Sequence, residues 1–419
     1  PSKPKSNMKL VENLDSCSFC GKHKDQVAKL IVGQDVAICN ECVELCKDLL
    51  HDEPAPKADV KASLDPREIL KNLNEYVIGQ ERAKMLLAVA IANHYKRISN
   101  TDHSVEIEKA NILMLGPTGS GKTLLARTVA RYLDVPFVIA DATSLTEAGY
   151  VGDDVESLIS RLYAAAEGDV EKTQRGIVFL DEVDKISRRS ESASITRDVS
   201  GEGVQQALLK LVEGTRCKIN TSGSRKTNIS DSVEIDTTNI LFIAGGAFVG
   251  LDKIIENRTS NRTMGIGADI KTQSEKDNSE NVLKKVEPDD LSKFGLIPEF
   301  VGRFPNWVAL SELSLEDLIA ILTKVKHCYV DQYKWLFDQD HIDLEFDTDA
   351  LSCIAENTIK NKTGARGLRS ILENILMDTQ FDLPAFAKQG VKKICITKET
   401  VENMSEPLKV FDQKTGEAS

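Results

Sequence analysis

No hydrophobic run in this sequence approaches the ~20 residues that a membrane-spanning helix needs, so we expect no contact with a membrane. The first residues, Pro-Ser-Lys-Pro-Lys, lack the apolar stretch of a secretory signal peptide. Two protease signatures, Gly-x-Ser-x-Gly and His-Glu-x-x-His, are also missing. These absences predict a cytoplasmic protein that is not itself a protease.

An excess of basic residues is lacking as well. The chain of 419 residues carries 53 Lys and Arg against 65 Asp and Glu, which gives a net charge of −12. Proteins that bind duplex DNA normally show a basic surface. The composition therefore predicts that nucleic acid is not a partner.

Cysteine is scarce except near the N-terminus, where five of the nine cysteines fall within residues 17–46. Four of them form two C-x₂-C pairs with eighteen residues between: Cys17, Cys20, Cys39 and Cys42. This spacing is typical of a structural Zn²⁺ site with four thiolate ligands, the alternative being four unrelated free thiols. A closed site performs no chemistry, so it indicates a docking or oligomerisation module, or a nucleic-acid finger, which the mixed charges disfavour.

A phosphate-binding loop follows an apolar strand in residues 111–123, which read Asn-Ile-Leu-Met-Leu-Gly-Pro-Thr-Gly-Ser-Gly-Lys-Thr. The glycines let backbone N–H groups face a phosphate, Lys122 adds a positive charge, and the Thr123 hydroxyl suits Mg²⁺. An amphipathic helix over 124–133 directs its positive end at the same phosphate. A chance Gly-rich turn is the alternative. We predict ATP and Mg²⁺ binding by Gly116, Pro117, Thr118, Gly119, Ser120, Gly121, Lys122, Thr123 and Leu124.

Residues 177–182, Ile-Val-Phe-Leu-Asp-Glu, predict a buried strand that ends in two carboxylates. The carboxyl edge of a parallel sheet is where ligands bind. We expect Asp181 to complete the Mg²⁺ shell and Glu182 to polarise the attacking water. Phosphoryl transfer also needs positive charge, and Arg303 and Arg366 are candidates because each lies beside a glycine, whereas an isolated Arg would suggest a surface salt bridge.

Helical patterns alternate with short apolar runs from residue 65 onward, which predicts an α/β fold with a parallel sheet. The expected strands are 112–115, 136–140, 177–180 and 240–244. Three long polar segments, 188–202, 218–236 and 257–281, are expected to be functional loops. Beyond Pro305 the pattern is mostly helical, with expected helices over 315–337, 348–359 and 367–381 and one strand over 393–397.

These patterns predict a zinc-binding module over 1–51, a linker over 52–64, a large ATPase domain over 65–310 and a small, mostly helical domain over 311–419. The linker is rich in Pro, Ala and charge and has no periodic apolar face.

Six motifs in this order make the chain similar to the ClpX family over nearly its whole length. They are the four-cysteine module, the linker, the phosphate loop, and the runs 180–185, 295–303 and 364–369. ClpX proteins are AAA+ unfoldase subunits of the ClpXP protease. The resemblance implies a homohexamer that works with a ClpP-like peptidase, with Arg303 as an arginine finger reaching the neighbouring subunit and Arg366 as a sensor-2 arginine acting within its own subunit.

Further residue roles come from the same resemblance. It implies that Val77 and Ile78 pack on adenine. It also implies that Tyr150 and Val151 form the pore loop gripping the polypeptide, and Tyr150 between glycines suits a mobile, non-specific grip, although a half-buried Tyr would be the plainer interpretation. Arg225 and Lys226 match a basic pore-entrance loop that here lacks the family's His. No polar sensor-1 residue is evident after residue 244.

The family's peptidase-docking loop matches Met264, Gly265 and Ile266, with Ile266 in place of the usual aromatic. We therefore expect an ATP-dependent unfoldase that threads unfolded or tagged proteins into a partner peptidase, with adaptor proteins binding the zinc module. A P-loop nucleic-acid motor or clamp loader with a zinc finger is the alternative. A non-catalytic ATP-binding scaffold is disfavoured by Asp181, Glu182 and Arg303.

Overall fold

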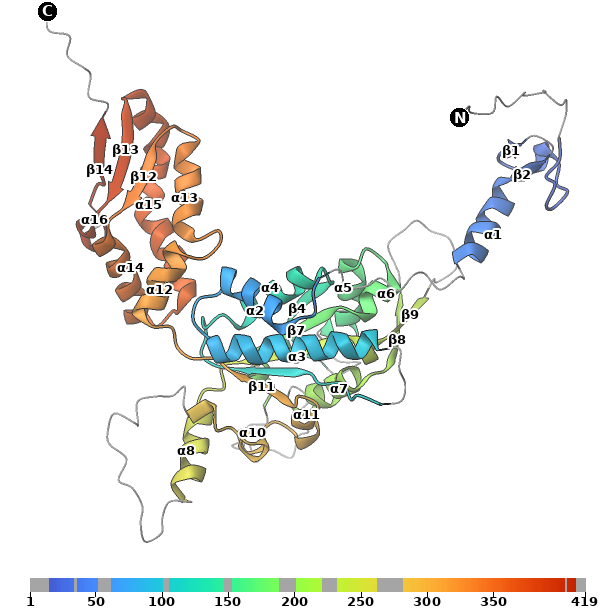
Figure 1. The fold of residues 1–419 in the computed structure, drawn as a ribbon, viewed down its shortest axis with the longest axis horizontal. Helices are drawn as coiled ribbons and strands as arrows, with labels where there is room; N and C mark the ends of the chain where they lie inside the picture. The colour runs from blue at the N-terminus through green and yellow to red at the C-terminus, as the bar shows by residue number, and fades with distance from the viewer. Residues whose placement is uncertain are drawn as a thin grey trace, which may run out of the picture. The chain divides into compact units, whose positions relative to one another are not determined.

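The computed structural model (Figure 1) describes residues 15–33, 36–51, 62–100, 105–146, 153–187, 201–220, 232–261, 282–403 and 405–411. The chain divides into two compact units, residues 1–59 and 60–419. Within the described parts, no helix is both long and apolar enough to cross a membrane. The domain boundaries expected at residues 51, 64 and 310 remain predictions.

The N-terminal unit is a small hairpin followed by a helix. Its elements are η1 (Lys24–Gln26), β1 (Leu30–Val32), β2 (Ala37–Cys39) and α1 (Asn40–His51). The two strands pair antiparallel, with Leu30 opposite Cys39. Its buried centre consists of three cysteines with Val27, Leu30 and Ile38 packed around them, so little apolar area holds this unit together.

The second unit contains a five-stranded parallel sheet of order β11-β3-β10-β7-β4. Its strands are β3 (Ile112–Leu115), β4 (Phe137–Asp141), β7 (Ile177–Asp181), β10 (Leu241–Gly246) and β11 (Asn306–Ala309). The sequence predicted the first four of these but missed the edge strand β11. This sheet confirms the predicted α/β class.

Helices cover both faces of the sheet, which is why its strands read as continuous apolar runs. One face packs on α2 (Pro66–Tyr76), α3 (Glu81–Ser99) and α4 (Lys122–Leu133). The other packs mainly on α5 (Ser157–Ala165), α7 (Glu202–Glu213), α8 (Leu251–Asn261), α10 (Pro288–Phe294) and α11 (Pro298–Gly302). The remaining short elements are η2 (Ala142–Ser144), β5 (Leu145–Thr146), β6 (Asp153–Asp154), α6 (Val170–Gln174), η3 (Val183–Ile186) and η4 (Thr237–Asn239).

The expected loop over 218–236 is wrong at both ends. The structure forms an antiparallel hairpin from β8 (Arg216–Asn220) and β9 (Ser232–Asp236). Cys217, Ile219 and Ile235 alternate with polar neighbours and are buried, and this period-2 pattern was hidden by the polar composition. Likewise, α8 continues to Asn261, inside the segment expected to be a loop from residue 257.

The C-terminal part contains more β-structure than the sequence predicted. Its elements are α12 (Leu315–Thr323), α13 (Tyr329–Asp338), β12 (Asp343–Phe346), α14 (Thr348–Lys360), α15 (Ala365–Lys388), β13 (Val391–Ile396), α16 (Lys398–Asn403) and β14 (Leu408–Phe411). Three strands form a sheet of order β12-β13-β14, although only β13 was expected.

The helix expected over 315–337 is in fact two helices. His327 has a left-handed backbone with φ of +60°, and the Cys328 sulfur accepts the backbone N–H of Asp331 as a cap for α13. A helix cannot continue through a left-handed residue. The break places residues 325–328 beside the end of α2, where they line a pocket described below.

Candidate functional site

The phosphate loop lies between β3 and α4, as the sequence predicts for this motif. Lys122, the first residue of α4, folds back over the loop and donates from Nζ to the carbonyl oxygens of Gly116 (2.6 Å) and Pro117 (2.9 Å). Burial lowers the pKa of Lys122, Arg366 adds to this effect, and Asp181 and Asp184 oppose it. An anion in this loop would offset the burial of the charged amine.

Ser120 supports the same interpretation of the loop. Its hydroxyl is buried and has no hydrogen-bond partner. Buried polar groups in folded proteins are nearly always paired, so an unpaired one at a binding loop calls for a ligand. The oxygens of a nucleoside phosphate would supply the missing partner.

Two carboxylates meet the loop from the end of β7, which β10 separates from β3 in the sheet. The Thr123 hydroxyl donates to Asp181 Oδ2 at 3.2 Å, which brings together the two groups predicted to hold Mg²⁺. The backbone N–H of Glu182 donates to Asp181 Oδ1 at 3.0 Å. Hydroxyl and carboxylate oxygens are the ligands that Mg²⁺ prefers.

Glu182 has a left-handed backbone, with φ of +58°, and its side chain forms an ion pair with Lys185. A residue other than glycine pays conformational energy for such a backbone, and strain of this kind collects at functional sites. The turn directs Glu182 away from the strand and into the cavity that Asp181 also lines.

Asp184 is a polar residue of the site that the sequence analysis did not assign. Its carboxylate accepts the backbone N–H groups of Ala247 and Phe248, both at 3.2 Å, just after β10 ends. Asp184, which follows the adjacent strand β7, thus holds the end of β10, where the sequence showed no polar sensor-1 residue. The signal was present in the run 180–185, whose second Asp had no role attached.

A cavity brings these groups together with Arg366, which lies in the first turn of α15. Its lining residues are Thr118, Gly119, Gly121, Lys122, Thr123, Leu124, Asp181, Glu182, Asp184, Lys185, Gly246, Ala247, Tyr329, Ala365 and Arg366. Three cations (Lys122, Lys185 and Arg366) and three carboxylates (Asp181, Glu182 and Asp184) therefore face one space. This arrangement suits a triphosphate with a divalent metal ion.

A second, more apolar pocket adjoins the first and shares Gly119, Gly121, Leu124, Tyr329 and Ala365 with it. Val77 and Ile78 line it, as the resemblance implied for an adenine site. Its other walls come from the C-terminal part: Leu313, Ile321, Val325, Lys326, His327, Cys328 and Gln332. Sequence reasoning missed these residues because nothing in their pattern marks the wall of a pocket.

Arg303 is not part of this cavity. It follows α11 and is paired with Glu213, at 2.7 Å from Nη2 and 2.9 Å from Nε. Its carbonyl accepts the side-chain amide of buried Asn111, whose oxygen in turn accepts the N–H of Phe242 on β10. The side chain is half exposed, so within one subunit Arg303 faces solvent, away from the lining of the phosphate cavity.

Several predicted residues lie outside the described residues. They are the pore-loop residues Tyr150 and Val151, the pore-entrance residues Arg225 and Lys226, and the docking residues Met264, Gly265 and Ile266. Their roles stay predictions.

In the N-terminal unit, the sulfur atoms of Cys17, Cys20, Cys39 and Cys42 all lie within 4.8 Å of one another. The Cys20 and Cys39 sulfurs are 3.7 Å apart. A tetrahedral Zn²⁺ with Zn–S bonds of about 2.3 Å separates its sulfurs by about 3.8 Å, so the cluster fits the ion. His23 and Cys46 are not members of this group.

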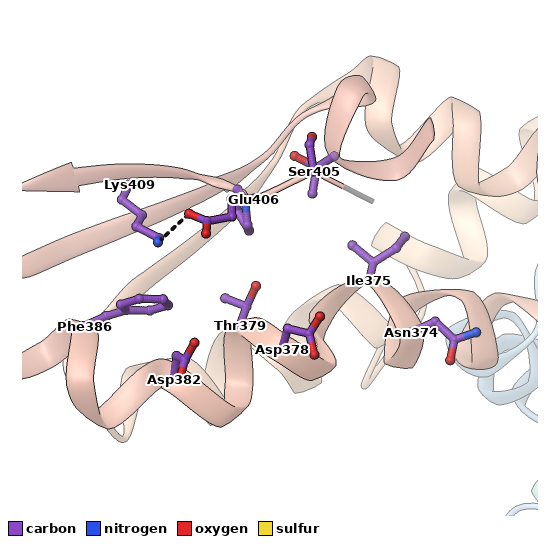
Figure 2. Close-up of a pocket in the computed structure, with 11 residues that line it drawn as sticks. Asn374, Ile375, Asp378, Thr379, Asp382, Phe386, Ser405, Glu406 and Lys409 are labelled. Atoms are coloured by element: carbon purple, nitrogen blue, oxygen red, sulfur yellow. Dashed lines mark hydrogen bonds and ion pairs between the residues drawn. The ribbon is translucent and has the colours of Figure 1, made fainter. Parts of the chain in front are cut away.

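A further hollow runs along α15, beside the segment that leads into β14, and it contains none of the predicted site residues (Figure 2). Asp378, Asp382 and Glu406 line it, and Glu406 accepts a hydrogen bond from Lys409 at 3.0 Å. The Lys409 amine also lies 4.1 Å from the centre of the Phe386 ring. Through its contact with Phe386, Lys409 links β14 to α15 along this groove.

Comparison with known proteins agrees with this geometry. The family model "ClpX C4-type zinc finger" matches residues 15–52, "AAA domain (Cdc48 subfamily)" matches 107–307, and "C-terminal, D2-small domain, of ClpB protein" matches 313–394. The ATP-dependent Clp protease ATP-binding subunit ClpX of Treponema denticola is 51% identical over 406 residues, which cover 95% of this chain and 97% of that protein. The chain therefore belongs to the ClpX family of AAA+ ATPases, the ATP-binding subunits of Clp proteases, which are not themselves the protease.

Proposed function

We propose that this protein is an ATP-driven unfoldase and translocase that recognises protein substrates, unfolds them and threads them into a separate ClpP-like peptidase. The observation that carries the proposal is the cavity in which the phosphate loop, the end of β7 and the first turn of α15 present their charges together. Its walls come from both the part of the chain that contains the five-stranded sheet and the C-terminal part, which supplies Tyr329, Ala365 and Arg366. Nucleotide bound there would contact both parts and can therefore change their arrangement relative to each other.

For hydrolysis, Lys122 and the loop amides hold the outer phosphates of ATP. Asp181 and Thr123 would hold Mg²⁺, which neutralises charge on the phosphates when bound. Glu182 orients and polarises the attacking water, for which its carboxylate must leave the Lys185 ion pair. Arg366 stabilises the negative charge that develops on the transferred phosphoryl group.

We further propose that the protein works as a ring of six subunits, in which Arg303 reaches the nucleotide of its neighbour. Two observations support this: Arg303 is half exposed, and it does not line the phosphate cavity of its own subunit. A finger supplied by a neighbouring chain is a common way to couple hydrolysis to assembly.

Tyr150 and Val151 would grip the polypeptide in the pore, and Arg225 and Lys226 would attract it to the entrance. Met264, Gly265 and Ile266 would insert into the peptidase, with Ile266 filling an apolar cleft. The four cysteines would hold Zn²⁺ in a module that docks adaptor proteins. A cytoplasmic location suits free thiols that bind metal, because a reducing compartment keeps them from forming disulfides.

The direct test measures ATP-dependent loss of fluorescence from a tagged fluorescent protein, with and without a ClpP-like peptidase. We expect loss of signal only with ATP, and irreversible loss only with the peptidase. Tyr150→Ala should retain ATPase activity and lose unfolding, because the change removes the gripping side chain and leaves the nucleotide site intact. ATPase activity stimulated by nucleic acid instead of by protein would favour the alternative of a nucleic-acid motor.

A further inference from the structure

Gln80 connects two parts of the chain that are far apart in sequence. It precedes α3, one residue beyond Gly79 and the base-pocket residues Val77 and Ile78, and its side chain contacts Ser311, between β11 and α12. Gln80 Nε2 donates to the Ser311 carbonyl at 2.9 Å. Gln80 Oε1 accepts the Ser311 N–H at 3.0 Å and its hydroxyl at 3.2 Å.

The neighbours of Gln80 meet the same C-terminal part. The backbone N–H of Lys326 donates to the Glu75 carbonyl at 2.8 Å. Gly79 lies against the Asp317 side chain, so that a Cβ built on this glycine would be 3.3 Å from Asp317 Oδ1. The segment that carries Val77 and Ile78 is therefore held between the sheet-bearing part and the residues that follow Ser311.

Lys84, one turn further along α3, holds the other side of the same segment. It is 1% exposed, and its amine donates to Asn74 Oδ1 (2.6 Å), Glu81 Oε1 (2.8 Å) and the Val77 carbonyl (3.3 Å). The first turns of α3 thus tie one wall of the base pocket to the core through Lys84. Gln80 ties the other wall, which begins at Leu313, through Ser311.

We infer that Gln80 is a positioning residue for ATP binding: its amide clamps Ser311 and sets the spacing between the Val77–Ile78 wall and the Leu313 wall of the base pocket. The inference rests on the nucleotide site of the proposed function. Only a primary amide of this length offers a donor and an acceptor to the backbone C=O and N–H of one residue. Gln80 keeps a left-handed backbone, with φ of +59°, a cost consistent with a side chain that must point at Ser311.

The main test replaces Gln80 with glycine, which accepts the left-handed backbone without strain and removes the clamp. We expect the KM for ATP to rise about tenfold, the equivalent of one or two net hydrogen bonds. At saturating ATP, kcat should change by less than about threefold, because the clamp acts on binding and touches no reacting atom. Hydrogen exchange of the Ser311 amide should become at least about tenfold faster.

A second variant separates the clamp from a general loss of packing. Gln80→Glu keeps an acceptor for the Ser311 N–H but, when ionised, places a carboxylate against the Ser311 carbonyl. A protonated carboxyl group can donate there again. The ratio of variant to wild-type KM should therefore fall as pH is lowered toward the pKa of a carboxylic acid. Ser311→Ala, which removes only the hydroxyl contact, should raise KM by less than about twofold.

A wild-type KM in Gln80→Gly together with unchanged exchange at Ser311 would overturn the inference. So would a KM ratio for Gln80→Glu that does not vary with pH, a measurement that remains available if Gln80→Gly fails to fold. Unfolding of the tagged substrate by the wild type, measured in the same preparations, tests the proposed function separately. Its failure beside a raised KM in the variants would refute the unfoldase assignment and leave the clamp supported.

Discussion

Gly119 and Gly364 lie backbone against backbone, one in the phosphate loop and the other just before α15. A Cβ built on Gly119 would lie 2.9 Å from Gly364 Cα, and a Cβ built on Gly364 would lie 2.9 Å from the Thr118 carbonyl oxygen. The absence of side chains at both positions is what lets Arg366 reach the phosphate cavity.

Gly364→Ala should therefore impair ATP turnover beyond its effect on stability. Gly364 has φ of +57° and ψ of −161°, a backbone that essentially only glycine adopts, so alanine costs about 1–3 kcal/mol in backbone strain and must also move α15 off the loop. We expect kcat/KM for ATP to fall by at least about tenfold. Gly390→Ala is the matched control, because Gly390 has φ of +83° and open space around its Cβ. Equal losses of ATPase activity in the two variants would show that the contact has no role.

Glu182→Gln should bind ATP but hydrolyse it at least about 100-fold more slowly, because an amide cannot polarise water as a carboxylate does. Asp181 and Thr123 are unchanged, so nucleotide affinity should remain close to that of the wild type. Equilibrium binding of a fluorescent ATP analogue and steady-state ATPase assays check the two parts. Turnover at the wild-type rate would mean that another group activates water.

Arg303→Ala should lower ATP hydrolysis by about 10³-fold if the arginine acts as a finger on the neighbouring subunit. Glu213→Ala frees Arg303 from its half-exposed ion pair and should leave hydrolysis within about twofold of the wild type, since such pairs contribute little. Mixing Arg303→Ala with Glu182→Gln subunits should restore part of the activity. No restoration in verified mixed rings would contradict a site shared between chains.

Removal of zinc should unfold the N-terminal unit alone. Three of the four clustered cysteines are buried, and few other side chains pack around them, so chelation or Cys39→Ser should abolish structure in residues 15–51. Cys46→Ser, outside the cluster, should retain both metal and fold. Metal analysis and circular dichroism of the isolated unit, with ATPase assays of a chain that begins near residue 62, measure these effects. An inactive truncated chain would show that the unit is needed for the ATPase.

His94 predicts a loss of stability in mild acid. Burial lowers its pKa to about 3, with the charges of Arg97 and Lys109 adding to the effect, and its Nε2 donates to the Asn239 carbonyl at 3.1 Å. The unfolded chain binds a proton with a pKa near 6.5, so stability is full above that pH and is lost as pH falls toward 3.

The loss attributable to His94 should be about 1 kcal/mol between pH 7 and pH 5.5. His94→Gln retains a donor for Asn239 and does not titrate, so its melting temperature should fall less over this range. Thermal unfolding of the wild type and the variant at both pH values provides the comparison. Parallel pH profiles would show that His94 is accessible to protons in the folded state.

The sequence by itself determined those features for which a short local pattern is compatible with one kind of structure. Residues 116–123 can curl around a phosphate because of their glycines, and the strands β3, β7 and β10 read as apolar runs because both faces of the sheet are buried. The spacing of Cys17, Cys20, Cys39 and Cys42 predicted the group that the structure brings within 4.8 Å. Each of these patterns depends on neighbours in sequence, so each could be read without the fold.

Only the tertiary structure decided which distant residues share a surface. The hairpin β8–β9 and the strands β11, β12 and β14 form through pairing with partners far along the chain, and their local sequences carry weak signals. Asp184 reaches the end of β10, Gln332 lines the same pocket as Val77 and Ile78, and Gln80 meets Ser311 across 231 positions in the sequence. These contacts arise from the packing of one part of the chain on another, because spacing along a chain says nothing of which side chains a parallel sheet and its covering helices will bring face to face.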